Sequence, residues 1–268
     1  MHPVLHDIVA RKSREVAEAR ERVPVEELRE RISELGRPRN FFGALVDRRH
    51  RDAIRVVAEL KRATSTGEVV RAELDPVALA RACAEGGAAA ISCVIDGVGS
   101  GGRLEHLHMI RDAVKLPVLR KDLIVDAYQV WESRAAGADA ILLVAEALPE
   151  RDVIDFQILA TELGMTTLLE VHDVEHLLRA VHVVGFPHAS YSLLAISNRH
   201  LRTMRPSVEH AMRLAELLED TSVVVADGGI RSPGDLRRLR DHGIHAAIVG
   251  EHLMRADDPA AALRALLG

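Results

Sequence analysis

The chain has 268 residues, of which 48% are apolar, two cysteines and a formal net charge of −5. This length suits a single α/β barrel, and the apolar fraction allows a sizeable core. The acidic balance argues against a general nucleic-acid binder, two cysteines do not form a disulfide framework, and no apolar run reaches the roughly 18 residues that predict a membrane span. The first residues lack the basic-then-apolar layout of a secretory signal, so we expect a cytoplasmic protein.

The first 35 residues predict helices. Apolar residues recur among dense charges over residues 5–35, and Pro24 is expected to end one helix and open the next. The segment Gly36-Arg37-Pro38-Arg39-Asn40 breaks this pattern. We therefore expect residues 1–50 to form a helical extension that packs on the mouth of a barrel formed by residues 51–268. The alternative is an amphipathic extension that is simply solvated.

After residue 50, short apolar runs alternate with longer helical patterns. Eight runs predict strands, at residues 56–61, 89–94, 117–120, 138–144, 166–171, 190–197, 222–226 and 246–249. Helical patterns follow them near residues 75–86, 104–114, 126–136, 149–163, 173–183, 207–219, 232–241 and 257–267. This alternation predicts a single (β/α)8 TIM barrel. A doubly wound sheet would also alternate, but the glycine-rich fingerprint expected after its first strand does not follow Lys61.

Polar residues gather where the predicted strands end. Glu59 and Lys61 are two residues apart on the first strand, so their side chains share a face. An unpaired buried charge is very costly, so both groups are expected to have a partner or a function. The other strand ends carry Arg120-Lys121-Asp122, Glu170 and His172, Ser197-Asn198-Arg199, Asp227-Gly228-Gly229, and Gly250-Glu251. In a barrel these ends meet at one rim, where active sites are built.

Two lysines and two glutamates on one rim suit acid–base or Schiff-base chemistry. A lysine near a second cation has a lowered pKa, whereas a lysine paired with a carboxylate stays protonated and can act as an acid. A purely structural salt bridge between Glu59 and Lys61 is the alternative. The fourteen histidines are scattered and do not show metal-ligand spacing beside a carboxylate, so we expect no metal and no other cofactor.

The last two loops predict an anion site. Gly228 and Gly229 precede one helix, and Gly250 and Glu251 open another, shorter one. Glycines let backbone N–H groups approach an anion closely, and the start of a helix favours negative charge. Barrels commonly bind phosphate after strands seven and eight. Turns use glycine for other reasons too, so it is the pairing of the two loops that favours a phosphorylated substrate.

Several segments resemble the indole-3-glycerol-phosphate synthase family, barrel enzymes of tryptophan biosynthesis. They include Ala58-Glu59-Leu60-Lys61-Arg62-Ala63, Pro117-Val118-Leu119-Arg120-Lys121-Asp122, Leu168-Leu169-Glu170-Val171-His172 and the stretches at residues 5–12, 135–143 and 249–255. The resemblance spans nearly the whole chain. It implies a carboxy-lyase that closes a ring on 1-(2-carboxyphenylamino)-1-deoxyribulose 5-phosphate with loss of CO2 and water.

The resemblance also implies roles for single residues. Lys121 looks like the general acid on the ketose carbonyl, and Lys61 like the partner that binds the anthranilate carboxylate or shuttles a proton. Glu170 resembles the residue that assists dehydration, and Glu59 the one that positions Lys61 and the substrate. Further substrate contacts fall on Ser197, Asn198, Arg199 and Leu123, and phosphate contacts on Thr64, Gly228, Gly229, Gly250 and Glu251.

Several of these positions depart from the family pattern. Leu123 replaces a phenylalanine, Ser197 replaces the asparagine expected to touch the substrate, and Asp227 and Gly228 stand in a turn that is usually Ser-Glu-Ser-Gly. A phenylalanine pair after the second strand is also missing. Arg103 is new at the rim, where it is expected to bind an extra carboxylate or phosphate, or else to be a solvated loop charge.

Two other functions remain open at this point. Aromatic residues make up only 3% of the chain, which favours a specialised paralogue that cyclises or condenses a less aromatic sugar phosphate. A non-catalytic barrel that binds a phosphorylated metabolite is the other, although a retired site has no physical need for the four charges of Glu59, Lys61, Lys121 and Glu170. In each case we expect a small phosphorylated ligand, no nucleic-acid or membrane partner, and a monomer or weak homo-oligomer.

Overall fold

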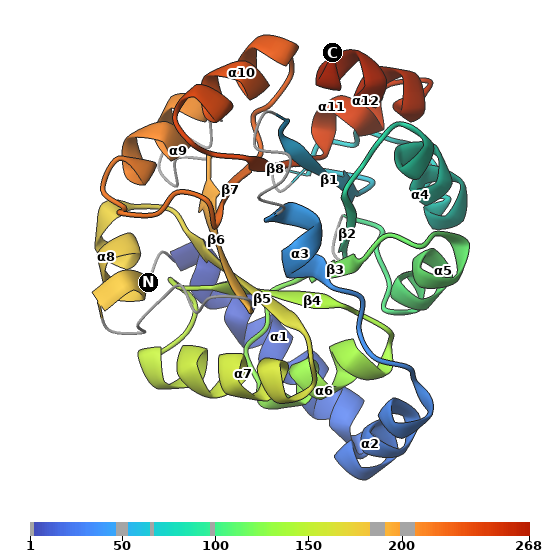
Figure 1. Cartoon of the computed structure of the whole chain (residues 1–268). Coiled ribbons are helices and arrows are strands. Elements are labelled where there is room, and N and C mark those ends of the chain that lie inside the picture. The colour runs from blue at the N-terminus through green and yellow to red at the C-terminus, as the bar shows by residue number, and fades with distance from the viewer. Residues whose placement is uncertain (1–2, 47–52, 65–66, 97–99, 183–190, 199–206) are drawn as a thin grey trace.

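The computed structural model describes residues 3–46, 53–64, 67–96, 100–182, 191–198 and 207–268. Eight parallel strands close into a barrel in chain order, with β8 pairing β1 (Figure 1). They are β1 (Arg55–Leu60), β2 (Ala90–Val94), β3 (Val118–Lys121), β4 (Ala140–Val144), β5 (Thr166–Val171), β6 (Ser192–Ser197), β7 (Val224–Asp227) and β8 (Ala246–Val249). The predicted (β/α)8 barrel is confirmed, and the predicted strand ends differ from the observed ones by at most two residues.

A ring of helices surrounds the strands. It consists of α4 (Pro76–Glu85), α5 (Glu105–Ala113), α6 (Ala127–Ala135), α7 (Glu150–Glu162), α8 (Val174–His182), α9 (Val208–Ala215), α10 (Pro233–Asp241), α11 (Glu251–Arg255) and α12 (Pro259–Leu267). The start of α10 shows how local sequence sets these bounds. The Ser232 hydroxyl accepts the Asp235 N–H at 3.2 Å, the Asp235 carboxylate accepts the Ser232 N–H at 2.9 Å, and Pro233 occupies the first turn.

The interior of the barrel is a packed core that a short helix closes at one end. Side chains from the strands, among them Val57, Leu119 and Leu168, fill the interior together with Phe41 and Leu45 of α3 (Phe41–Leu45). The Thr166 hydroxyl, at the start of β5, accepts the Phe42 N–H at 3.2 Å, which places α3 at the amino ends of the strands. Figure 1 shows α3 over the centre of the ring.

The two remaining helices, α1 (Pro3–Arg22) and α2 (Val25–Glu34), lie along the outside of the barrel against α6. Val16 and Leu28 bury their side chains beside Tyr128 of α6, whose hydroxyl donates to the carbonyl groups of the α1 end and the following residue. Pro24 divides the two helices, as the sequence predicts. None of the helices in the described part of the chain is long and apolar enough to cross a bilayer.

The first helix also reaches the carboxyl rim. The Lys12 ammonium lies 2.7 Å from Oδ1 of Asp122, and the Arg11 guanidinium lies 2.9 Å from Oδ1 of Asp96. Asp122 directly follows β3, and Asp96 lies two residues after the end of β2. The segment before the barrel therefore contacts both of its ends, with α1 at the carboxyl rim and α3 at the amino end.

Candidate active site

Two lysines and two carboxylates converge at the carboxyl rim. The Lys121 ammonium, at the end of β3, lies 2.6 Å from Oε2 of Glu59 on β1 and 2.5 Å from Oδ2 of Asp227 on β7. The other oxygen of Glu59 pairs closely with the Lys61 ammonium. The salt bridge between Glu59 and Lys61 is thus present, but as part of a larger network in which Glu59 bridges both lysines.

Burial and charge set the protonation of this network. Burial opposes ionisation of Glu59, but Lys121 and Lys61 outweigh it and hold the pKa of Glu59 well below its usual range. Burial likewise opposes the charge of Lys121, but Asp227, Glu59 and Glu170 together raise its pKa far above the ordinary value. Lys121 is therefore an ammonium group at neutral pH, which is the form that can donate a proton.

Asp227 behaves differently from its neighbours. Burial, helped by the negative charges of Glu170 and Glu59, raises the pKa of Asp227, although the contact with Lys121 works in the opposite direction. Among the three acids around Lys121, Asp227 is thus the one most easily protonated. The sequence placed Asp227 at a strand end but gave it no role, because its partner lies 106 residues away.

Glu170, the second-last residue of β5, contacts a histidine. The ring Nε2 of His172 lies 3.0 Å from Oε1 of Glu170, and Glu146, after β4, lies on the other side of the ring. Burial opposes the charge of Glu170, but His172 and Lys121 prevail and lower its pKa. Burial also opposes the charge on His172, but Glu146 and Glu170 raise its pKa to about 10. Glu170 is consequently a carboxylate beside an imidazolium.

A small pocket, partly open to solvent, lies beside Glu59 and Lys61. The two predicted glycine turns line it, with Gly228, Gly229, Gly250 and Glu251 among its residues. Gly228 and Gly229 have φ angles of 82° and 76°, which favour glycine. At Gly250, an added Cβ would overlap the Glu59 carboxylate. The predicted phosphate loops and the lysine–glutamate network therefore share one cavity.

Arg231 also lines this pocket, although the sequence assigned it no role. Its guanidinium lies 3.4 Å from Oε1 of Glu251, a carboxylate that also contacts Arg255 at 3.2 Å. Its position in the same loop as Gly228 and Gly229 is the sequence feature that could have identified Arg231 as a candidate anion-binding residue. Because the Glu251 carboxylate forms ion pairs with both arginines, the backbone of Glu251 is the part suited to contact an anion.

Other predicted site residues lie elsewhere. The Thr64 hydroxyl accepts the Glu68 N–H at 3.2 Å within the loop after β1, and Thr64 does not line the glycine pocket. The Arg103 side chain is exposed, with its Nε 3.4 Å from Nε2 of His106. Leu123 follows β3 and is partly buried, and its N–H donates to the Asp122 carboxylate at 2.9 Å.

The residues at the end of β6 differ in what their side chains contact. Ser197 is buried and pairs in register with Asp227. Asn198 is fully buried, where its amide nitrogen donates to the Gly228 carbonyl at 2.7 Å and its amide oxygen accepts the Ala211 N–H at 3.1 Å. The Asn198 side chain therefore holds the first glycine turn in place. Arg199 lies outside the described residues.

Comparison with known proteins agrees with this geometry. The family model for indole-3-glycerol phosphate synthase matches residues 5–266. The chain is 38% identical to the indole-3-glycerol phosphate synthase of Rhodopirellula baltica over 264 residues, with 98% of each protein covered. It is also 38% identical to the enzyme of that name from Polaromonas naphthalenivorans over 268 residues, with both fully covered.

Solved structures support the fold. A 3-hexulose-6-phosphate synthase matches with a TM-score of 0.61 at 14% identity, over 80% of this chain and 98% of that one. Identity that low shows a shared barrel and nothing further. The match to the family model, in contrast, covers nearly every residue. By its sequence over almost its whole length, the chain belongs to the indole-3-glycerol phosphate synthase family.

Proposed function

We propose that Lys121, Lys61, Glu170 and Glu59 carry out the ring closure of 1-(2-carboxyphenylamino)-1-deoxyribulose 5-phosphate, with loss of CO2 and water. Membership of the family confirms the predicted enzyme class, a carboxy-lyase of tryptophan biosynthesis acting on a small phosphorylated substrate. The observation that carries the residue roles is the position of the Lys121 ammonium between Glu59 and Asp227, at the mouth of the barrel.

The first chemical step needs a proton donor at the ketose carbonyl. As the ring carbon that bears the carboxylate attacks that carbonyl, Lys121 gives a proton to its oxygen, and the new carbon–carbon bond forms. The carboxylate then leaves as CO2, and its bonding electrons restore the aromatic ring. Glu59 helps to keep Lys121 protonated and holds both lysines in place for this step.

The second step removes the hydroxyl group that the first step created. The hydroxyl needs a proton to leave as water, and the neighbouring carbon must lose one. We assign the supply of the first proton to Lys61, which pairs with Glu59, and the removal of the second to Glu170, whose pKa is lowered. Ser197, beside Asp227 at the end of β6, is a further proposed substrate contact, as are Leu123 and Arg199.

The substrate phosphate is proposed to occupy the pocket between the two glycine turns. Lys61 and Arg231 supply positive charge there, and the glycines allow close backbone approach. We further propose that the enzyme works in the cytoplasm as a monomer or weak homo-oligomer. Light scattering of the purified chain tests the oligomeric state.

Substitution of Lys121 tests the proposal. Lys121→Met is expected to lower kcat by a factor of about 10² to 10⁴, the usual contribution of a positioned acid, in an assay that follows indole fluorescence. Lys115→Met is the matched control, because Lys115 is exposed and distant from the network. A folded Lys121→Met protein with normal turnover would remove Lys121 from the mechanism. Growth of a tryptophan auxotroph that lacks the synthase tests the overall reaction.

A further inference from the structure

A line of ionisable side chains continues from Glu170 toward the outside of the barrel. The His172 ring lies between two carboxylates, with Nε2 3.0 Å from Oε1 of Glu170 and Nδ1 3.2 Å from Oε2 of Glu146. The exposed fractions of the Glu170, His172 and Glu146 side chains are 9%, 13% and 6%. Water therefore screens these charges little, and each group depends on its neighbours.

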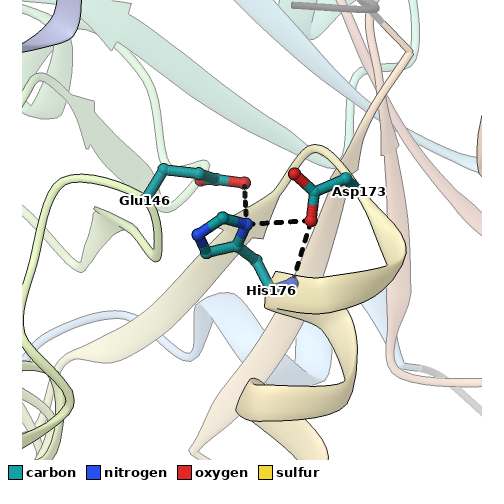
Figure 2. Close-up of side chains that lie close together, drawn as sticks. All are labelled: Glu146, Asp173 and His176. Atoms are coloured by element: carbon teal, nitrogen blue, oxygen red, sulfur yellow. Dashed lines mark hydrogen bonds and ion pairs between the residues drawn. The ribbon is translucent and has the colours of Figure 1, made fainter. Parts of the chain in front are cut away.

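Glu146 is fixed on this line by more than the ring contact. Its Oε1 accepts the backbone N–H of His172 at 2.8 Å, so both of its oxygens face His172. His176 of α8 lies beyond, with Nδ1 3.6 Å from Oε1 of Glu146 and 2.8 Å from Oδ1 of Asp173 (Figure 2). On the opposite side, Nε2 of His210 on α9 lies 2.7 Å from the His172 carbonyl oxygen.

The group of Glu146, Asp173 and His176 has the composition of a cation site, and Figure 2 shows the three side chains turned toward one another. Two of its oxygens already accept hydrogen bonds from backbone N–H groups, however. Oε1 of Glu146 accepts the N–H of His172, and Oδ1 of Asp173 accepts the N–H of His176 at 2.9 Å, as at an ordinary helix start. The geometry therefore favours, over a metal centre, a support for His172 in which Glu146 binds its backbone N–H and forms an ion pair with its ring.

We propose that Glu146 is a positioning residue, which acts through His172 to hold Glu170 oriented and ionised for the reaction. The inference deepens the proposed function and rests on it, because it takes Glu170 to be the group that accepts a proton during the loss of water. Glu146 itself is separated from Glu170 by the whole imidazole ring and does not touch the substrate.

The physical basis is one proton shared by His172 and Glu170. While Glu146 faces the ring, the proton stays on His172, because a cation between two carboxylates is favoured. Without Glu146, the nearby negative charges of Asp227 and Glu59 push the proton toward Glu170, against the attraction of Lys121. A protonated Glu170 cannot act as a base, so activity would return only when a higher pH removes the shared proton.

The test compares Glu146→Gln with Glu150→Gln in the full chain. Gln keeps the size of Glu146 and an acceptor for the His172 N–H, whereas Glu150 pairs with Arg179 at 3.0 Å on the neighbouring helix and does not contact His172. We expect kcat of Glu146→Gln to fall at least about tenfold at about pH 7 and to recover substantially by about pH 9, so that the acid limb of the kcat profile moves to higher pH. Glu150→Gln should keep the wild-type profile.

NMR of ¹⁵N-histidine-labelled protein supplies a readout that needs no turnover. The His172 ring, assigned with a His172→Gln variant, should keep both protons beyond about pH 8 in the wild type and lose one at lower pH in Glu146→Gln. These titrations do not depend on the proposed reaction. They therefore distinguish failure of the Glu146 proposal from failure of the proposed function.

Several results would overturn the proposal. An equal fractional loss of kcat at every pH would mean a merely structural role for Glu146. The same titration of His172 with and without the Glu146 charge would remove the electrostatic link. If Glu146→Gln does not fold, the wild-type titration still decides, because loss of a ring proton below about pH 8 contradicts the arrangement. A stoichiometric metal ion that disappears in His176→Gln would replace the support with a metal centre.

Discussion

The Nζ atom of Lys121 lies 2.5 Å from Oδ2 of Asp227, although the two residues come from strands on opposite sides of the barrel. β3 and β7 are separated by three strands in either direction round the ring, so their side chains meet over the barrel axis. The Lys121 ammonium, the proposed acid, is thus held at the centre of the rim, which the loops after all eight strands surround.

Asp227→Asn should change the pH at which Lys121 loses its proton. Burial works against the charge of Lys121, and Asp227 is the strongest of the groups that raise its pKa, so the Asn variant should have a lower Lys121 pKa. The alkaline limb of kcat/KM should move to lower pH, and kcat should fall by roughly tenfold because Lys121 loses an orienting partner. A pH profile of both constants measures the change.

Asp112→Asn provides the control for this experiment, since Asp112 is exposed and pairs only with His108 among the contacts of the described residues. An alkaline limb in the same place for wild type and Asp227→Asn would show that Asp227 does not control the protonation of Lys121.

Gly250→Ala should disrupt the network through sterics alone. The added methyl group would overlap the Glu59 carboxylate and lie 3.1 Å from its Cβ, so Glu59 must move away from one or both lysines. We expect kcat/KM to fall by about tenfold to a hundredfold, since small misplacements of reacting groups are that costly. Gly36→Ala is the control, because an added Cβ there meets nothing within 4 Å. Equal activity of the two variants would contradict the tight packing of Gly250 on Glu59.

Lys12→Met should destabilise the fold by anchoring α1 less well. Lys12 is 5% exposed and faces Asp122, which is 1% exposed and otherwise paired with Arg120 at 2.9 Å. Removal of one member of a buried ion pair leaves a desolvated charge, and we expect a loss of about 3 kcal/mol in the free energy of unfolding, measured with urea.

Arg20→Met on the same helix is a matched comparison. Its pair with Asp126 is just as short, at 2.6 Å, but the Arg20 side chain is 53% exposed. Water and salt screen such a pair, so the loss should stay below about 1 kcal/mol. Similar losses for the two variants would mean that burial does not strengthen the Lys12 contact.

The stability of the protein should depend on pH through His172. Burial opposes its charge, but Glu146 and Glu170 raise its pKa from the ordinary 6.5 to about 10. The stability that this histidine contributes is therefore complete below about pH 6.5 and is lost as the pH rises through about 10, a change on the order of a few kcal/mol. Urea unfolding of wild type and His172→Gln at several pH values measures it. The difference in free energy of unfolding between wild type and His172→Gln should become smaller as the pH rises. A difference that does not change with pH would exclude a raised pKa of His172.

Much of the fold could be predicted because periodicity acts locally. The strands at residues 166–171 and 246–249 match the structure residue for residue. Five-residue α3 was not predicted, since so short a helix shows no period, and its Phe41 is recognisable as core only when the strands around it are known. Helix α9 ends four residues before its predicted end because the apolar pattern continues into a turn.

The rim residues show where this local information ends. A glutamate and a lysine two residues apart in one apolar run can be recognised from the sequence, so Glu59 and Lys61 could be predicted as site residues. The family resemblance assigned Asn198 to the substrate, but a carboxamide can bind a ligand or a backbone, and here its amide nitrogen donates to the Gly228 carbonyl. Glu146 stands in Ala145-Glu146-Ala147, which looks like an ordinary solvated loop until β5 brings His172 beside it.

Helix α3 also limits the routes by which small molecules can enter or leave the active site. With Phe41 and Leu45 filling the amino end, the described residues leave the carboxyl rim as the passage between the Lys121 network and solvent. Carbon dioxide is released before the loss of water completes the indole compound, so it must leave through this rim while the organic intermediate is bound. The gas and the indole compound therefore leave through the same end of the barrel.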